Sequence, residues 1–290
     1  MSSILTGRFA PFLNVHLAAL RAALAEGGVT VVVTGAEASR QSRFPWTAAE
    51  REAMIRAAVG EDAARLVFRH ADDNPYLGQR PECPTREDEE AVCAAFFAGN
   101  DATVSAAVPS EVFAAMQAFR SVPDYARLAE EAAYIADYRR SWEAAPWPPT
   151  FVTADIFITC AEHLLLVRRG GQPGKGMWAL PGGFVDQQEW VIDAAMRELR
   201  EETGLDLDDA TIRDCLRHQT VFDDPWRSAR GRTVTHGFRF DLPGDIPEVA
   251  GGDDAQEARW WPIDGLGQLH GQFLEDHGQM IDYFLKAGKD

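Results

Sequence analysis

Residues 183–205 read GFVDQQEWVIDAAMRELREETGL, and this stretch decides how the C-terminal half of the chain is interpreted. The pattern predicts a helix that begins near Gln188 and stops before Gly204, because glycine commonly follows the last turn of a helix. A helix advances about 100° per residue, which sorts its side chains into arcs. The arc expected to pack inward consists of Ile192, Ala195, Met196, Leu199 and Thr203.

Three carboxylates, Glu198, Glu201 and Glu202, share the neighbouring arc. Their mutual repulsion and their position near the negative end of the helix each cost on the order of 0.3–1 kcal/mol. Mg²⁺ or Mn²⁺ would reverse that cost, because such hard ions prefer carboxylate and phosphate oxygens. Arg197 lies within one turn and can orient the carboxylates, while bare backbone at Gly182 can supply a carbonyl ligand. A solvated acidic face is the alternative interpretation.

The spacing of these residues matches the Nudix box, and the chain resembles the Nudix hydrolases. The matching positions are Gly183, Glu189, Arg197, Glu198, Leu199, Glu201, Glu202, Gly204 and Leu205. The resemblance implies that Glu198, Glu201 and Glu202 bind divalent metal and that Arg197 holds them in place. It also implies the reaction, which is hydrolysis of a nucleoside diphosphate linked to another group.

Length and composition limit the remaining possibilities. A chain of 290 residues suggests two domains. A net charge of -17 without any basic run argues against nucleic-acid and anionic-membrane partners, so we expect a small nucleotide substrate. Cys83, Cys93, Cys160 and Cys215 show no paired spacing, which predicts reduced thiols in a cytoplasmic protein. No apolar run approaches the roughly 18 residues of a membrane span.

The N-terminal part alternates strands and helices. We expect a short strand from Ser3, a helix ending at Gly27, and a buried parallel strand in the run VTVVVTG, residues 29–35. A capping signature at Thr47 predicts a helix to about Val59, and residues 64–70 supply a third strand. The order predicts a doubly wound, Rossmann-like sheet.

This region resembles the nucleotidyltransferase domain of nicotinamide mononucleotide adenylyltransferases through GRFAPFLNVHL, residues 7–17. In that family the motif continues as H-x-G-H, whose histidines contact ATP phosphates. Here those four positions are Leu13, Asn14, Val15 and His16. The departure puts adenylyl transfer in doubt, and His16 is expected to be a satisfied histidine, with Arg8 a structural cation.

The later part of this domain also departs from the family. The stretch CPTREDEEAVCAAF, where a second phosphate-binding motif is expected, is acidic. After the third strand only a loop, residues 73–86, and helices near 87–98, 109–120 and 124–144 are predicted. We therefore expect a truncated, degenerate nucleotidyltransferase-like domain that serves as a scaffold or dimerisation module.

The proline-rich stretch AAPWPPT, residues 144–150, predicts an extended linker. We place the domain boundary there, giving a nucleotidyltransferase-like domain over 1–145 and a Nudix domain over 146–290. The second domain is expected to be a Nudix α/β/α sandwich. Its predicted elements are a hairpin at 151–160 and 163–169, strands near 212–222, 232–241 and 259–261, and a helix at about 275–286.

Substrate recognition is expected outside the box. Arg227, Arg230 and Arg232 lie close together in an otherwise acidic chain, and arginine binds phosphate oxygens bidentately. The alternative is a solvated loop paired to its own aspartates, Asp223 and Asp224. Nearby aromatic side chains offer a stacking surface for adenine, or else belong to the core. They are Phe222 and Trp226.

A further carboxylate is expected in the loop before the RWW strand, because Nudix enzymes commonly place a metal ligand or general base there. Glu257 is the first candidate, and Asp253 and Asp254 are close alternatives. A plain acidic turn explains each of them equally well.

Taken over nearly its whole length, the chain resembles the bifunctional adenylyltransferase–Nudix proteins of bacterial NAD metabolism. The resemblance implies hydrolysis of ADP-ribose to AMP and ribose 5-phosphate with Mg²⁺ or Mn²⁺. Two alternatives stay open, namely residual adenylyltransferase activity and a non-catalytic sensor of ADP-ribose or another nucleotide. We also expect a homodimer, because a three-strand sheet leaves an edge that must be covered.

Overall fold

The computed structural model describes residues 3–38, 40–79 and 84–287. The chain divides into two compact units, Met1–Tyr134 and Ile135–Asp290. The division falls inside one long helix, whereas the sequence places the boundary at residue 145. Each unit has its own hydrophobic core and is described by itself.

Cysteines and membrane-spanning character bear on the sequence expectations. Cys93, Cys160 and Cys215 are buried thiols without a disulfide, and Cys83 lies outside the described residues. Across the described ranges, no helix combines the length and the apolar character that crossing a membrane requires.

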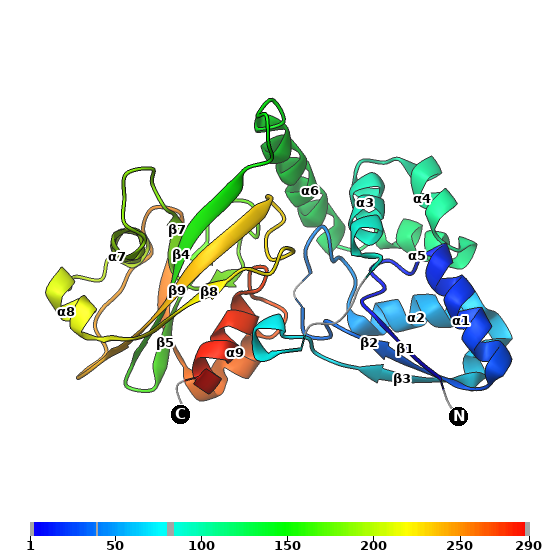
Figure 1. Cartoon of the computed structure of the whole chain (residues 1–290), viewed down its shortest axis with the longest axis horizontal. Coiled ribbons are helices and arrows are strands. Elements are labelled where there is room, and N and C mark those ends of the chain that lie inside the picture. Colours follow the sequence, from blue (N-terminus) through cyan, green and yellow to red (C-terminus); the bar gives the residue numbers. More distant parts are fainter. Residues whose placement is uncertain (1–2, 39, 80–83, 288–290) are drawn as a thin grey trace. The chain divides into compact units, whose positions relative to one another are not determined.

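The N-terminal unit is built on a parallel sheet of three strands (Figure 1). In spatial order these are β1 (Ser3–Gly7), β2 (Val29–Val33) and β3 (Leu66–His70). Helix α1 (Asn14–Glu26) connects β1 to β2, and α2 (Ala48–Val59) connects β2 to β3. These elements confirm the predicted alternation of strands and helices and the Rossmann-like character of the sheet.

The expectation that the sheet is doubly wound is wrong. Each strand follows its predecessor in the same direction across the sheet, and right-handed connections in one direction place both helices on one face. That face is buried through Val29, Val31 and Val33, whereas Ile4 is 70% exposed and Val67 is 58% exposed. Among the described residues the opposite face of this sheet is therefore partly exposed, which is unusual for parallel strands.

Helices and short 3-10 turns complete this unit. The three predicted helices are confirmed, and a short fourth one, α4, lies between the first two. The helices are α3 (Arg86–Phe97), α4 (Asp101–Ala107), α5 (Ser110–Phe119) and α6 (Asp124–Ser141), and the 3-10 turns are η1 (Gly60–Arg65) and η2 (Pro75–Leu77). An aromatic cluster in the core joins Trp46 to Phe96 and Phe119, with ring centroids 6.0 and 5.7 Å apart.

The C-terminal unit contains a mixed sheet of seven strands. Its main strands follow the spatial order β10-β5-β4-β9-β8, with β6 paired to β5 and β7 paired to β4. The strands are β4 (Thr150–Cys160), β5 (His163–Arg169), β6 (Trp178–Ala179), β7 (Gly182–Phe184), β8 (Leu216–Phe222), β9 (Arg232–Leu242) and β10 (Ala255–Pro262). The predicted hairpin of β4 and β5 is confirmed.

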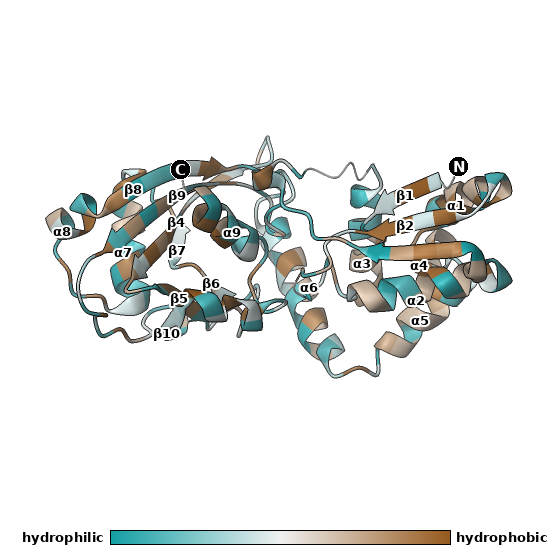
Figure 2. Cartoon of the chain, turned by 90° about the horizontal axis from the view of Figure 1, so that it is seen from below, coloured by the Kyte–Doolittle hydropathy of each residue, from teal (hydrophilic) through white to brown (hydrophobic). Residues whose placement is uncertain are grey.

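Helices cover both faces of this sheet. On one face α7 (Val191–Thr203) packs its buried side chains with Ile156 and Ile158 of β4. The intervening Phe157 points to the other face, where its ring lies 5.2 Å from that of Phe284 in α9 (His277–Ala287). Hydrophobic and hydrophilic residues alternate along α9, as expected for a helix with one face on a sheet (Figure 2). The α/β/α sandwich predicted for this half is confirmed.

Two element boundaries differ from the sequence expectations. The strand expected from residue 212 begins at Leu216, because α8 (Asp209–Asp214) is opened by Asp208, whose carboxylate accepts the N–H of Thr211. Helix α7 begins at Val191 rather than Gln188, and it ends as predicted at Gly204, which has a φ of +61°. A last 3-10 segment, η3 (Ile263–Leu269), precedes α9.

Candidate active site

Glu198 and Glu202 of α7 face two glycines of strand β7, Gly182 and Gly183. The N–H of Gly182 donates to Glu202 Oε2 at 2.9 Å. Gly182 has a φ of +154°, and a Cβ there would lie 2.3 Å from the carbonyl oxygen of Ala154. A Cβ on Gly183 would lie 2.4 Å from Glu198 Oε1. Both glycines are therefore required for backbone and carboxylates to approach this closely.

Arg197 links the carboxylates of the box to one another. Its Nε and Nη2 donate to the two oxygens of Glu189, each at 2.9 Å. Its Nη1 donates to Glu198 Oε1 at 2.9 Å and to Glu201 Oε2 at 3.0 Å. The remaining bond runs from Nη2 to the carbonyl of Phe184 at 3.1 Å. One guanidinium thus orients three glutamates and also holds strand β7, which faces them.

Burial opposes ionisation of two of these glutamates. Glu202 is 4% exposed, and burial together with the charges of Glu198 and Asp155 raises its pKa to about 8. Burial also raises the pKa of Glu198, against the opposing effect of Arg197. By contrast, the hydrogen bonds from Arg197 lower the pKa of Glu189. Burial therefore opposes ionisation of Glu198 and Glu202, and a nearby cation would favour their charged forms.

The donor set suits a hard divalent cation. The buried Glu202 and the half-buried Glu198 lie beside the backbone of Gly182 and Gly183, and oxygen ligands of this kind suit Mg²⁺ and Mn²⁺. Within the described residues, however, no group of three or more acidic, histidine or cysteine side chains is arranged to hold a metal ion. Arg197 holds oxygens of Glu198 and Glu201. Metal binding by the four predicted ligands, which include Gly182 and Glu201, stays a prediction.

The acidic loop before β10 lies against the end of α7. The N–H of Gly252 donates to the carbonyl of Glu202 at 3.2 Å. In the same loop Asp253 has a φ of +47°, and its charge contributes to the raised pKa of Glu198. Glu257 lies further along, on β10, opposite Arg168 of β5. The loop thus brings Asp253 toward the carboxylates, and the role predicted for Glu257 stays a prediction.

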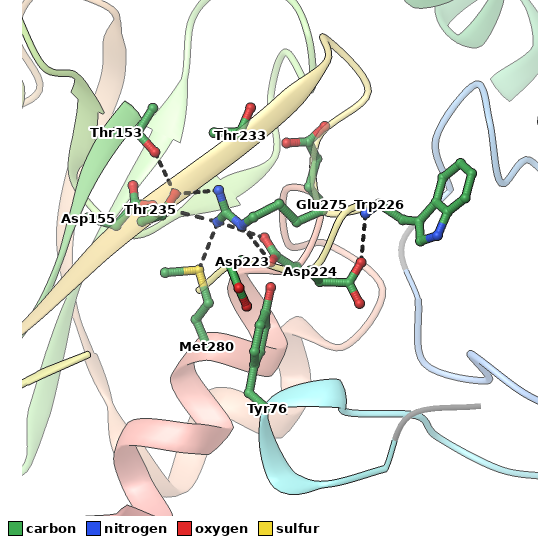
Figure 3. A network of polar contacts seen from close by, with 12 residues as sticks. Tyr76, Thr153, Asp155, Asp223, Asp224, Trp226, Thr233, Thr235, Glu275 and Met280 are labelled. Carbon is green, nitrogen blue, oxygen red and sulfur yellow. Dashed lines mark hydrogen bonds and ion pairs between the residues drawn. The ribbon is translucent and has the colours of Figure 1, made fainter. Parts of the chain in front are cut away.

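Arg227 lies inside the C-terminal unit and is held by other side chains of that unit. It is 6% exposed, and its Nε and Nη2 donate to the two oxygens of Asp276, each at 3.0 Å. Its Nη1 donates to the hydroxyl of Thr235, which in turn bonds Thr153 (Figure 3). Asp155 lies 3.8 Å from Nη2. These contacts engage the guanidinium within the protein, and substrate binding by Arg227 stays a prediction.

The other two predicted arginines differ in their surroundings. The guanidinium of Arg230 lies over the ring of Phe184, 4.8 Å from its centroid. Its Nε is buried and makes no hydrogen bond with any described residue. Arg232 Nη1 donates to the carbonyl of Asp223 at 2.6 Å. Arg230 therefore contacts a residue of the box, Phe184, whose carbonyl accepts a hydrogen bond from Arg197.

The two aromatic candidates differ in burial. Phe222 is 1% exposed and packs edge-on against Tyr283 and Phe284, with centroids 5.4 and 5.5 Å apart. Trp226 is half-buried, and its backbone N–H donates to Asp224. The position of Phe222 favours the core alternative, whereas stacking on a substrate stays a prediction for both.

Sequence reasoning missed three polar residues that lie beside this site. Asp155 is buried in β4, and burial raises its pKa to about 7 against the effect of Arg227. Asp276 and His277 lie at the start of α9, and burial and Arg227 lower the pKa of His277 to about 3. Its Nδ1 accepts the N–H of Leu180 at 3.0 Å. The sequence offers a signal for Asp155, because it is a lone acid inside the apolar strand FVTADIFITC. A buried charge requires a partner.

The histidine retained in the N-terminal unit is fully engaged. His16 Nδ1 accepts the N–H of Leu13 at 3.0 Å, and its Nε2 bonds the hydroxyl of Thr85 at 2.8 Å. Burial lowers the pKa of His16 to about 4, so the ring is neutral. Arg8 pairs with Asp73 at 3.4 Å. These contacts are consistent with the structural roles expected of both residues, and those roles stay predictions.

Comparison with known sequences identifies the second unit. The NUDIX domain model matches residues 149–284. The chain is 36% identical over 135 residues to an ADP-ribose pyrophosphatase of Methanocaldococcus jannaschii, covering 47% of this chain and 73% of that protein. It is also 38% identical over 82 residues to the ADPR responsive transcriptional repressor NtrR of Acinetobacter baylyi, covering 26% of this chain and 31% of that protein.

Comparison with solved structures covers both units. A bifunctional NMN adenylyltransferase/ADP ribose pyrophosphatase from Francisella tularensis matches with a TM-score of 0.89 and 26% identity, over 99% of each chain. A crystal structure of the same description, complexed with AMP and Mn ion, matches with a TM-score of 0.86 and the same identity and coverage. The N-terminal unit thus has the fold of an adenylyltransferase domain, as the sequence resemblance predicts.

Proposed function

The chain belongs to the NUDIX family of hydrolases, and on that premise we propose that its C-terminal unit hydrolyses ADP-ribose to AMP and ribose 5-phosphate. The observation that carries the proposal is the pair of carboxyl groups, buried Glu202 and half-buried Glu198, that face Gly182 and Gly183 of β7. The similarity to the Methanocaldococcus jannaschii pyrophosphatase supports the choice of substrate. In this proposal the box binds the metal and the phosphates, so selectivity for ADP-ribose depends on residues outside the box.

Mg²⁺ or Mn²⁺ is the proposed cofactor, with Glu198, Glu201, Glu202 and the Gly182 carbonyl as its ligands. When bound, such an ion polarises a diphosphate and lowers the pKa of a bound water. Arg197 keeps the glutamates oriented through the hydrogen bonds described above. The manganese in the similar Francisella tularensis structure is consistent with this choice.

Hydrolysis requires a base in addition to the ligands. A water oxygen forms a new bond to one phosphorus as the bridging P–O bond breaks, and the departing phosphate carries the bridging oxygen. A carboxylate takes the proton released by the water. Asp253 and Glu257 are the proposed candidates, with Asp254 beside them, and Asp253 is the one whose charge reaches Glu198.

Arg230 and Arg232 are the proposed ligands of the substrate phosphates. Arg230 supports this role best, because its buried Nε has no hydrogen-bond partner among the described residues and its guanidinium rests on Phe184. A phosphate oxygen would supply the missing acceptor in a charge-assisted hydrogen bond. Arg232 lies two residues further along at the start of β9.

The test is a panel of nucleoside diphosphate derivatives incubated with Mg²⁺ and with EDTA. We expect ADP-ribose to be hydrolysed fastest, to give equal amounts of AMP and ribose 5-phosphate, and only in the presence of metal. A different nucleoside diphosphate that reacts more than tenfold faster would replace ADP-ribose as the proposed substrate. No hydrolysis of any compound would instead favour a nucleotide sensor, the alternative suggested by the similarity to the transcriptional repressor.

A second candidate function concerns the N-terminal unit. Its fold resembles that of a bifunctional protein described as an NMN adenylyltransferase, which favours retained adenylyl transfer. The nitrogens of His16 are engaged by Leu13 and Thr85, however, and Val15 replaces the glycine of the family motif. We therefore propose a scaffold role for this unit. Formation of NAD from ATP and nicotinamide mononucleotide by the purified protein would overturn that assignment.

Assembly, boundary and location complete the proposal. We propose a homodimer that works in the cytoplasm, where thiols such as Cys93 stay reduced. Light scattering is expected to give twice the chain mass of 32.0 kDa, whereas a single chain mass contradicts the dimer. The proposed domain boundary at residues 145 and 146 predicts first cleavage in the linker during limited proteolysis. Cell fractionation tests the location.

A further inference from the structure

Four consecutive residues, Leu274–His277, hold two segments that lie far apart in the sequence. The outer two residues bind residues 178–182, which we call the lead-in because they run into the box. The N–H of Leu274 donates to the carbonyl of Trp178 at 2.8 Å. Nδ1 of His277 accepts the N–H of Leu180 at 3.0 Å.

The inner two residues bind residues 227–232, the arginine loop. Glu275 Oε1 accepts the N–H of Ala229 at 2.6 Å. Asp276 accepts both parallel hydrogen bonds from Arg227, a bidentate pair that fixes orientation as well as distance. Adjacent residues of one short segment thus hold two different parts of the site.

The backbone explains how neighbours reach opposite sides. Glu275 has a φ of +42°, a left-handed conformation that non-glycine residues rarely adopt. The turn directs the side chains of Glu275 and Asp276 to the arginine loop and that of His277 to the lead-in. Asp276 and His277 are each 6% exposed, so their contacts are protected from water.

Each segment leads within three residues to a group of the proposed site. Leu180 precedes by two residues Gly182, whose N–H holds Glu202. Arg227 precedes by three residues Arg230, the proposed phosphate ligand. Displacement of either contact is therefore expected to move the corresponding half of the site.

Asp155 lies where the two halves meet. It is the register partner of Gly182 on β7, and a Cβ on that glycine would lie 2.5 Å from Asp155 Oδ1. Its other oxygen lies 3.8 Å from Arg227 Nη2. The carboxylate side and the arginine side therefore share a buried wall.

We propose that Leu274–His277 is a clip that sets the spacing between the carboxylates and the arginine loop, with His277 positioning the metal side and Asp276 the substrate side. The proposal rests on the proposed function, because that function makes one side bind metal and the other bind phosphate. Both are positioning residues, since they act through Leu180 and Arg227.

The first measurement is Mn²⁺ binding to the full chain without substrate, followed by electron paramagnetic resonance. His277→Leu is expected to weaken Mn²⁺ binding by about tenfold, the size typical of residues that orient metal ligands. His277→Asn is expected to restore most of it, because the amide oxygen replaces Nδ1 as acceptor for the N–H of Leu180. Asp276→Asn is expected to leave Mn²⁺ binding within about twofold of wild type.

The second measurement is ADP-ribose binding in EDTA, followed by calorimetry. Here the two variants exchange roles. Asp276→Asn is expected to bind ADP-ribose about tenfold more weakly than wild type, and His277→Leu is expected to bind it within about twofold of wild type. The steady-state constants should divide in the same way, with KM raised in Asp276→Asn and kcat lowered in His277→Leu. Thermal unfolding of each variant shows whether it is folded.

The clip is overturned if each folded variant changes both binding constants equally, or if neither changes either constant. It is also overturned if His277→Asn binds Mn²⁺ as weakly as His277→Leu while melting like wild type. A wild-type protein that hydrolyses no ADP-ribose with Mg²⁺ refutes the proposed function, together with the part assigned to Asp276. The part assigned to His277 is decided by Mn²⁺ binding alone.

Discussion

Two buried glutamates, one in each unit, show how different surroundings give the same residue different roles. Glu89 in the N-terminal unit is 3% exposed, and Glu202 in the C-terminal unit is 4% exposed. Burial raises the pKa of Glu89 to about 7 and that of Glu202 to about 8. The two groups thus face the same unfavourable desolvation.

Their partners differ. Glu89 accepts the N–H of Ala10 at 3.2 Å and the hydroxyl of Thr85 at 3.1 Å, and Thr85 is in turn bonded by His16. Glu202 has the N–H of Gly182, while the nearby charge of Glu198 repels it. The first carboxyl group is satisfied within its own unit. The second is the one for which we propose a cation as the missing partner, and this difference in partners distinguishes the structural cluster from the candidate active site.

The largest expected effect comes from removing the charge of Glu202. Glu202→Gln is expected to lower kcat for ADP-ribose by about 100-fold or more, because a neutral amide cannot replace a metal-binding carboxylate. Circular dichroism and thermal unfolding should show a folded protein. Glu89→Gln is the matched control in the other unit and should leave hydrolysis within about twofold. Near-normal turnover by folded Glu202→Gln would remove Glu202 from the set of ligands.

The arginine loop should give the next largest effect. Arg230→Ala is expected to raise KM for ADP-ribose by about 10- to 100-fold, because a charge-assisted hydrogen bond contributes about 1.5–3 kcal/mol. Arg232→Ala should raise KM less, since its Nη1 already bonds the carbonyl of Asp223. Steady-state kinetics with Mg²⁺ tests both variants. An unchanged KM in both would show that this loop is a solvated surface.

Disruption of the satisfied cluster should affect stability and leave catalysis intact. His16→Ala removes the acceptor for the N–H of Leu13 and the partner of Thr85, which is expected to cost about 1–3 kcal/mol of unfolding free energy. Val15→Ala on the same helix, at a position 54% exposed, should change stability by less than about 0.5 kcal/mol. Urea unfolding measures both. Loss of Nudix activity in folded His16→Ala would contradict the division of roles between the units.

The sequence predicts the parts of the fold that depend on local patterns. The helix of the box ends at Gly204, and β4 and β5 form the expected hairpin, because a terminal glycine and alternating strands act over a few residues. The doubly wound sheet was predicted wrongly. The direction in which β2 and β3 join the sheet is set by packing across the whole unit, which no short pattern records.

The same distinction between local patterns and long-range packing applies to the residues of the candidate site. Spacing along a single helix predicts that Arg197 and the glutamates lie together, and the structure places them within hydrogen-bonding distance. Asp155, Asp276 and His277 were missed, because they meet only after distant strands and α9 pack together. The sequence does not distinguish Arg227 from Arg230. The burial of Arg227, which distinguishes the two, is evident only in the structure.

The last expected effect is a pH dependence that distinguishes the two glutamates directly. Both have pKa values in the folded chain above the ordinary value near 4.5, so the unfolded chain loses these protons first as pH rises. Stability in EDTA should therefore be highest below about pH 4.5 for these groups, fall between that pH and about 7 or 8, and then level off. Glu202→Gln and Glu89→Gln should each remove part of this fall.

Metal then separates the two contributions. Mg²⁺ stabilises the charged form of Glu202, so it should flatten the fall in wild type and in Glu89→Gln. It should not change the part of the slope that Glu89 contributes, which remains in Glu202→Gln. Urea unfolding between pH 5 and 9, with Mg²⁺ or EDTA, measures these slopes. Equal flattening by Mg²⁺ in wild type and Glu202→Gln would mean that the cation binds elsewhere, and the contrast between the two carboxyl groups would then lose its basis.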